Sequence, residues 1–252
     1  MAAVAGSSAA AALLFRVQGG IARRSIGRPL GDDAPSADRT YQRKLGDPIR
    51  LLVVGDSIAA GLGASKPKHT LGARLARGLA AERQRSVQLR TTAVVGSESS
   101  MLAAQLDSLP LGYRPDVVVI VVGGNDVMHR VRTAQAAAHL GAAVRRLRAL
   151  GAEVVVGTCP DLGALPVVPQ PLRSLGRRAS RRLAAAQVRA VQGAGGHPVS
   201  LVRALGPMYL DRPEDMFAED RFHPSSLGYR RAAKALLPDV LAAAGSPAPG
   251  PP

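Results

Sequence analysis

Apolar runs alternate with segments of mixed polarity through the middle of the chain. Short continuous apolar runs predict buried strands, and segments in which apolar residues recur every three or four positions predict amphipathic helices. The strand candidates are 50–54, 87–95, 117–122, 154–158 and 199–203. The helix candidates are 71–83, 100–108, 133–150, 172–192 and 225–243.

This alternation of strands and helices predicts an α/β fold. The segment 117–122 contains only valine and isoleucine, which is typical of a central parallel strand covered on both faces. Strand–helix repeats with right-handed crossovers give a sheet with helices on both sides. We therefore expect a three-layer α/β/α sandwich around a central five-stranded parallel sheet, formed by residues 48–243.

The two ends of the chain differ in composition from this domain. Residues 1–15 are small and apolar and are followed by Arg16, so we expect 1–27 to be a signal-like or anchor-like segment, or an amphipathic one. Residues 28–47 are expected to be a linker, and 244–252 a disordered Pro/Gly tail. The apolar start favours an exported or envelope-associated protein, and a cytoplasmic location stays open.

The amino-acid composition argues against several classes of function. The formal net charge of +15 is compatible with an anionic partner, but only four of the 33 basic residues are lysine, which suggests a coding bias toward arginine. With no Trp, three Phe and four Tyr, the chain has few aromatic rings for stacking on bases, so we do not expect nucleic-acid binding. The single cysteine, Cys159, excludes an internal disulfide, and the histidine spacing does not indicate a metal site. We expect a monomer that needs no cofactor.

Polar residues follow the strand candidates at the points where sites form in parallel sheets. Gly55, Asp56 and Ser57 come directly after the first candidate, Gly96 follows the second, and Asn125 follows the third. A Gly-Asp-Ser sequence alone is also ordinary turn chemistry. If the sheet is parallel, however, all three segments lie at one edge of it, and Ser57 becomes a candidate nucleophile.

A serine nucleophile needs a base, and His223 is the best candidate. Asp220 lies three residues earlier, and within one tight loop its carboxylate could hold the far ring nitrogen of His223. The alternative is that Asp220 only caps the last helix. An acyl-transfer site also needs donors for the oxyanion, and the backbone N–H of Ser57, the N–H of Gly96 and the side-chain amide of Asn125 are candidates. Gly96 and Asn125 could each be turn residues instead.

These four blocks resemble the SGNH (GDSL-like) hydrolase superfamily, of the bacterial lipase/esterase type. The blocks around Ser57, Asn125 and His223 match closely, whereas the block around Gly96 lacks the usual Asn-x-Gly context. The resemblance covers roughly 48–243. It implies a flavodoxin-like fold, metal-independent cleavage of esters or thioesters, a transient acyl group on Ser57, and an Asp220–His223 pair as orienter and base.

Three functions fit these residues. The first is hydrolysis of carboxylic esters of lipids, glycans or small molecules through an acyl-enzyme on Ser57. The second is an acyltransferase, in which an alcohol takes the acyl group from the same acyl-enzyme. The third is a non-catalytic binding module, which the complete set of reactive residues disfavours. The apolar segment 159–170 and the segment 206–219, both expected as loops beside the site, favour short to medium acyl chains.

Overall fold

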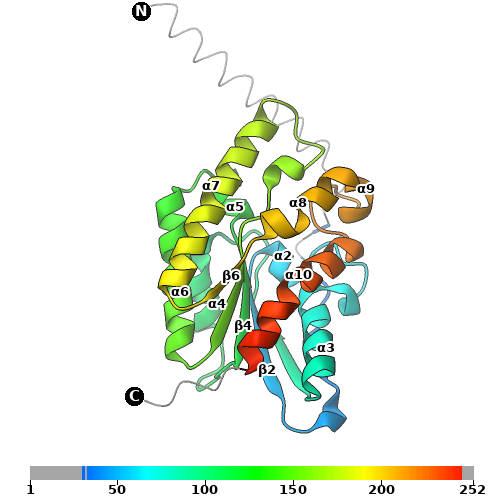
Figure 1. The fold of residues 1–252 in the computed structure, drawn as a ribbon, viewed down its shortest axis with the longest axis vertical. Coiled ribbons are helices and arrows are strands. Elements are labelled where there is room, and N and C mark those ends of the chain that lie inside the picture. Colours follow the sequence, from blue (N-terminus) through cyan, green and yellow to red (C-terminus); the bar gives the residue numbers. More distant parts are fainter. Residues whose placement is uncertain (1–29, 32, 246–252) are drawn as a thin grey trace, which may run out of the picture.

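A six-stranded sheet forms the centre of the protein (Figure 1). The structure is a computed structural model and describes residues 30–31 and 33–245. The strands follow the spatial order β1-β3-β2-β4-β5-β6. Their bounds are Thr40–Tyr41 (β1), Ile49–Gly55 (β2), Val87–Thr91 (β3), Val117–Val121 (β4), Glu153–Gly157 (β5) and His197–Val199 (β6).

The five strands β2 to β6 run parallel, as the sequence predicts. Counted by themselves they have the order 2-1-3-4-5, which is that of flavodoxin-like sheets. Every residue of β4 and β5 is buried, because helices cover both faces of these central strands. The carboxyl ends of β2, β4 and β5 therefore open at one edge of the sheet.

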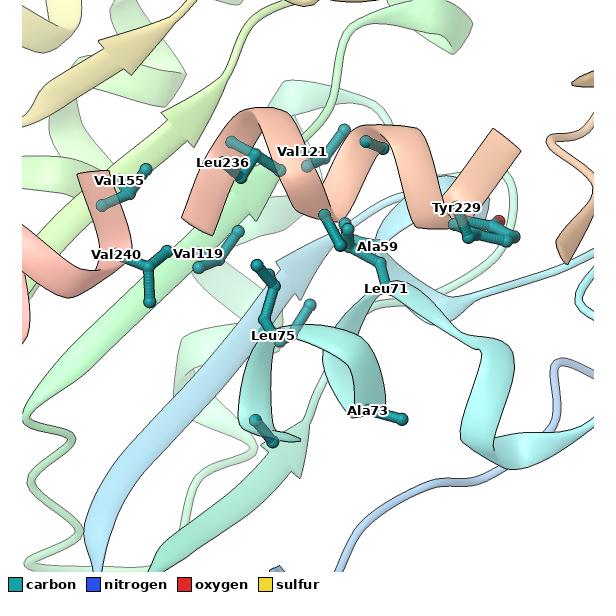
Figure 2. Packing of buried hydrophobic residues seen from close by; sticks show 14 of the residues in the cluster. Ala59, Leu71, Ala73, Leu75, Val119, Val121, Val155, Tyr229, Leu236 and Val240 are labelled. Atoms are coloured by element: carbon teal, nitrogen blue, oxygen red, sulfur yellow. The ribbon is translucent and has the colours of Figure 1, made fainter. Parts of the chain in front are cut away.

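Helices pack on both faces and complete the three layers. One face carries α3 and α10, whose apolar side chains pack with Val119, Val121 and Val155 of the sheet (Figure 2). The other face carries α4, α6 and part of α7. The helices are α2 (Ser57–Ala60), α3 (Leu71–Arg83), α4 (Leu102–Asp107), α5 (Gly124–Met128), α6 (Thr133–Ala149), α7 (Leu172–Gly193), α8 (Leu201–Asp211), α9 (Pro213–Met216) and α10 (Ser226–Gly245). Short 3-10 turns are η1 (Arg43–Leu45), η2 (Pro67–His69), η3 (Ser99–Met101) and η4 (Leu162–Ala164).

Several predicted segments differ from the structure, and the strand expected at 87–95 already ends at Thr91. The strand expected at 199–203 ends at Val199, and a helix, α8, begins at Leu201. The segment 206–219, expected as a loop, contains the second half of α8 and all of α9. The reason is local: the Ser200 hydroxyl accepts the Arg203 N–H at 3.4 Å and caps a helix whose buried side chains are four residues apart.

Part of the segment expected to be a linker belongs to the sheet. Thr40–Tyr41 forms β1, which pairs antiparallel with β3 and adds a sixth strand to the five expected. Tyr41 is buried in the core, and its hydroxyl donates to the carbonyl of Ala37 at 2.8 Å. Aromatic and β-branched residues favour such an edge position.

The expectations for 1–27 and for most of the 244–252 tail fall outside the described residues. Among the residues that the structure does describe, no helix combines the length and the apolar character needed to cross a membrane.

Candidate active site

The strand β2 ends in a sharp turn that places Ser57 at the edge of the sheet. Gly55 has a φ of 138°, and a Cβ there would lie 1.9 Å from the carbonyl oxygen of Val121, so only glycine fits. The next N–H, that of Asp56, donates to the same Val121 oxygen at 3.0 Å. Asp56 then caps α2 by accepting the N–H of Ile58, and Ser57 is the first residue of that helix. The N–H of Ser57 consequently has no intrahelical acceptor.

The predicted base lies within hydrogen-bond reach of this serine. The Nε2 atom of His223 is 3.0 Å from Oγ of Ser57, and Nδ1 is 2.5 Å from Oδ2 of Asp220. Because the carboxylate can only accept, it favours the tautomer with the proton on Nδ1, which leaves Nε2 free to accept the serine proton. The three residues form a chain of contacts from the loop before α10 to the turn after β2.

Asp220 is held firmly in its ionised form. Burial by itself would raise the pKa of this carboxyl, but the hydrogen bond with the His223 ring outweighs it, together with those from the N–H groups of Phe222 and His223, and the pKa is lowered. These amides lie 3.0 Å from Oδ1 and also fix the loop. Asp220 accepts hydrogen bonds from two backbone N–H groups of its own turn and also contacts the ring of His223. Its role therefore goes beyond capping a helix.

Asn125 lies at the same edge of the sheet, on α5. Its side chain is buried, and Nδ2 donates one hydrogen to the carbonyl of Ser97 at 2.9 Å. A primary amide carries two hydrogens, so a second donor remains for a ligand. Asn125 also borders the cavity that contains Ser57 and His223. The structure therefore brings together Ser57, Asn125, Asp220 and His223 as the sequence predicts.

Gly96 is less directly connected to the site. It is exposed, its φ is 81°, and it is not among the residues that border the cavity. The neighbouring Ser97 does reach the site, through the bond from Asn125 to its carbonyl. The contribution of the Gly96 N–H to an oxyanion hole thus stays a prediction.

Gln105, on α4, is a site residue that sequence reasoning missed. Its side chain is buried and spans the end of β2: Oε1 accepts the Gly55 N–H at 2.9 Å, and Nε2 donates to the Gly55 carbonyl at 2.8 Å. Nε2 also lies 2.9 Å from the Ser97 hydroxyl. Gln105 therefore joins the backbone before the serine to the loop that holds Asn125. No sequence signal identifies Gln105, because a single glutamine in an amphipathic helix belongs to no recognisable motif.

Two further carboxylates are buried beside the site. Burial raises the pKa of Asp56 to about 7, in spite of the hydrogen bond from Ile58 N–H and the nearby His223. Burial also raises the pKa of Asp126, which accepts the N–H and hydroxyl of Ser99. Both side chains bond to the starts of short helices, Asp56 to α2 and Asp126 to η3. Within the described part of the chain, no three His, Cys, Asp or Glu side chains are grouped so that they could hold a metal ion.

A mostly apolar cavity that opens to solvent adjoins Ser57 and His223. Side chains from α8 and from η4 form much of its wall, and the rings of Tyr209 and Phe217 pack with centroids 4.7 Å apart. Both segments predicted to line the site contribute, but one does so as a helix. The apolar side chains of the wall include those of Ile58, Leu162, Leu165, Leu201, Leu205 and Phe217.

Comparison with known proteins agrees with this geometry. The model of the GDSL-like lipase/acylhydrolase family matches residues 53–231, which include all the site residues above. The chain belongs to this family. Membership of this esterase family confirms the resemblance seen in the four sequence blocks, and the protein is a carboxylester hydrolase.

Relatives of this esterase are named for the same activity. It is 42% identical over 218 residues to the GDSL-like esterase Rv1075c of Mycobacterium tuberculosis, a match that covers 82% of this chain and 69% of the relative. It is 35% identical over 106 residues to the esterase TesA of Pseudomonas aeruginosa, covering 42% of this chain and 52% of TesA. These names support ester hydrolysis and do not favour the acyltransferase alternative.

Solved structures share the fold of the esterase. A crystal structure of TesA superposes with a TM-score of 0.62 at 23% identity, covering 77% of this chain and 99% of TesA. A structure of Axe2, an acetylxylan esterase from Geobacillus stearothermophilus, gives a TM-score of 0.59 at 20% identity, covering 77% and 95%. At these identities the likeness establishes the three-layer architecture and its parallel sheet.

Proposed function

We propose that Ser57 is the nucleophile of this esterase and that His223 and Asp220 activate it. In the first half-reaction the Ser57 oxygen bonds to the ester carbonyl carbon while His223 takes the hydroxyl proton. His223 then returns this proton to the leaving alcohol as the ester C–O bond breaks, which leaves an acyl group on Ser57. In the second half-reaction, water attacks the acyl group with the same assistance, releasing the carboxylic acid and restoring the serine.

The observation that carries this proposal is the unbroken contact chain from Asp220 through His223 to Ser57 at the mouth of an apolar cavity. Asp220 is held ionised, so it favours the imidazolium that forms when His223 accepts the proton. A glutamate or a metal ion is not required at any step. The fold brings His223 to Ser57, the first residue of α2, across a separation of 166 residues in the sequence.

Oxyanion stabilisation is assigned to groups at the same edge of the sheet. The Ser57 N–H at the start of α2 and the second Nδ2 hydrogen of Asn125 are the donors nearest to the reacting centre in this proposal. We assign the third donor to the N–H of Gly96, on the basis of its position after the second strand candidate and of the sequence resemblance. These donors would stabilise the charge that develops on the carbonyl oxygen during attack.

The substrates proposed are esters with an uncharged, apolar acyl group of short to medium length. The support is the chemistry of the wall, in which Leu162, Leu201, Leu205 and Phe217 offer no hydrogen-bonding side chains. Such a wall favours an acyl chain over a charged group, because burying an unpaired charge is costly. The alcohol portion would then lie toward the solvent opening.

A kinetic comparison tests the nucleophile. Ser57→Ala should lower kcat on a p-nitrophenyl ester by about a thousandfold or more, because the acyl-enzyme can no longer form. Ser86→Ala is a suitable control, since Ser86 is a buried serine at the opposite end of the sheet, next to Gly46. A Ser57→Ala enzyme that retains the wild-type rate would refute the assignment.

The choice of acceptor is tested in the same assay. Addition of an alcohol such as glycerol should leave the carboxylic acid as the main product if water is the acceptor. Accumulation of the glycerol ester in place of the acid would instead favour the acyltransferase.

A further inference from the structure

A second group of serine and histidine side chains lies outside the ester cavity. Oγ of Ser65 is 2.9 Å from Oγ of Ser226 and 3.0 Å from Nδ1 of His69, and Nδ1 of His69 is 3.1 Å from Oγ of Ser226. We call these three residues the Ser65–His69–Ser226 cluster. None of them borders the cavity that contains Ser57. They come from the segment after α2 and from the first residue of α10, so two distant parts of the chain build the cluster.

Backbone contacts hold the cluster in place. The Ser65 N–H donates to Oγ of Ser226 at 3.1 Å. The half-buried Arg74 guanidinium donates to the carbonyls of His69 and Ser226 at 3.0 and 2.9 Å. Arg74 therefore links the segment of Ser65 and His69 to the start of α10. Because it bonds only to backbone carbonyls, the hydroxyl and imidazole groups of the cluster stay available.

Cations surround the cluster. Lys66 and Lys68 lie within the same segment as Ser65 and His69, Arg77 lies one turn after Arg74, and Arg230 lies one turn after Ser226. Lys66, Lys68, Arg77 and Arg230 are exposed, and none of them forms an ion pair with a carboxylate of the described residues. Burial and then the charges of Arg74, Lys68, Lys66 and Arg77 lower the pKa of His69. A lowered pKa favours the neutral ring, whose Nδ1 can accept from a serine hydroxyl.

The donors available here match those that bind a tetrahedral oxyanion. Two hydroxyl groups can rotate outward, and the Ser226 N–H, at the first position of the 20-residue helix α10, has no acceptor among the described residues. A phosphate group would accept several of these donors at once and would also neutralise the excess positive charge. A neutral ligand would gain no electrostatic stabilisation from these cations.

We propose that the Ser65–His69–Ser226 cluster, with Lys66, Lys68, Arg77 and Arg230, is a binding site for a phosphate group. This site is separate from the ester cavity, and its existence does not depend on the role of Ser57. It does lie close to the loop of the base: a Cβ on Gly63 would be 2.7 Å from the Pro224 carbonyl and 3.1 Å from Cβ of His223. A phosphate held there would anchor a phosphorylated compound or a phospholipid headgroup beside the mouth of the active site.

Titration of the full-length protein with inorganic phosphate, at constant ionic strength set with chloride, tests the site directly. We expect saturable binding, with the largest amide NMR shifts at Ser65, His69 and Ser226. Lys66→Ala/Lys68→Ala should weaken binding at least about tenfold because it removes two unpaired cations. Arg178→Ala/Arg182→Ala, which removes two α7 arginines that make no ion pair with a described carboxylate, should leave binding unchanged.

A second variant separates a built site from diffuse charge. Ser65→Ala/Ser226→Ala keeps every charge but removes both hydroxyl donors, so it should also weaken phosphate binding. Equal affinity in this variant and the wild type, or weakening by the Arg178/Arg182 control as large as that of the lysine variant, would overturn the proposal. So would the absence of saturable binding.

Vesicles distinguish the two sources of phosphate. Sedimentation with phosphatidylglycerol vesicles that inorganic phosphate competes away, and that Lys66→Ala/Lys68→Ala abolishes, identifies a lipid headgroup as the ligand. Phosphate binding with no sedimentation identifies a soluble phosphate. Sedimentation that phosphate cannot displace contradicts a discrete site. Hydrolysis of an uncharged short ester should be normal in these variants, which keeps this test independent of the proposed catalytic role of Ser57.

Discussion

Ser57 depends on residues that are remote from it in sequence. A serine hydroxyl is a weak nucleophile until a base accepts its proton, and the base here is 166 residues away on the loop before α10. Gly55 makes the approach possible, because a side chain at that position would collide with the Val121 carbonyl. The reactivity proposed for Ser57 is thus a property of three chain segments that meet at one strand end.

Gln105 is the residue whose substitution tests how precisely these segments must meet. Gln105→Leu should lower kcat about 10- to 100-fold with little change in KM, because small displacements of reacting groups are costly in rate. The reason is that Gln105 connects Gly55 to Ser97, and Ser97 in turn holds Asn125. Steady-state kinetics on a short p-nitrophenyl ester would measure both constants.

Stability must be separated from this effect on rate. Gln105→Leu removes the acceptor of the buried Gly55 N–H, which costs about 1–3 kcal/mol, whereas the Gly55 carbonyl keeps the N–H of Val94 as a donor. Ser86→Ala, which removes a buried hydrogen bond to Gly46 far from the site, is expected to lose stability while keeping its kcat. If the two variants lose kcat equally, Gln105 has no special positioning role.

Asp56 should make the protein less stable as the pH rises. Its pKa is about 7 in the folded protein and 3.8 in the reference state, so the folded form binds the extra proton between these values. Each pH unit in that window then removes up to about 1.4 kcal/mol of folding free energy, and the effect ends above about pH 7. Asp56→Asn keeps an acceptor for Ile58 N–H but cannot ionise.

Urea unfolding of both proteins at several pH values measures this linkage. The stability of Asp56→Asn relative to the wild type should increase from about pH 4 to about pH 7 and stay level above that. A difference that does not vary with pH would show that burial does not perturb Asp56 in this way.

At the scale of elements, α8 decides the shape of the cavity. The sequence did not predict this helix, because Gly206 and Pro207 are typical of loops. The helix forms nevertheless, since Leu201, Leu205 and Tyr209 are spaced to bury one side and Ser200 caps the start. Tertiary burial outweighs the local signal of two helix-breaking residues, so the helical part of the apolar wall could not be predicted from the sequence, although the part from 159–170 could.

Leu205 offers a test of the wall. Leu205→Trp should fill part of the cavity and lower kcat/KM for an octanoyl ester by about tenfold or more, with a smaller effect on an acetyl ester. Met208→Trp is the matched control, because Met208 is exposed on the same helix and does not border the cavity. An equal loss for both esters in Leu205→Trp would indicate general damage and argue against an acyl pocket.

At the scale of the whole molecule, the parallel sheet explains why so much of the site was predictable. Each of Ser57 and Asn125 follows an apolar run, and parallel strands bring their carboxyl ends to one edge whatever the loops do. Asp220 and His223 were found by their spacing and by family resemblance. Gln105 could not be found, because its function depends on tertiary contacts with Gly55 and not on any local pattern.

The edges of the domain were harder to predict than its centre. The strand β1 has only two residues, Thr40 and Tyr41, and lies in a segment rich in polar residues, Gly and Pro. Such a short strand has no periodicity to detect, and its place in the sheet depends on the neighbouring β3. The four parallel pairings, in contrast, follow from the alternation of apolar runs and amphipathic helices.

The central claim is that Ser57 carries the acyl group. Incubation of the protein with a fluorophosphonate, followed by proteolysis and mass spectrometry, tests it most directly, since such reagents trap activated serines as stable adducts. We predict one adduct per molecule, on the peptide that contains Ser57, and strongly reduced labelling in His223→Ala. An adduct on another serine, or labelling of Ser57 that is unaffected by loss of His223, would contradict the account.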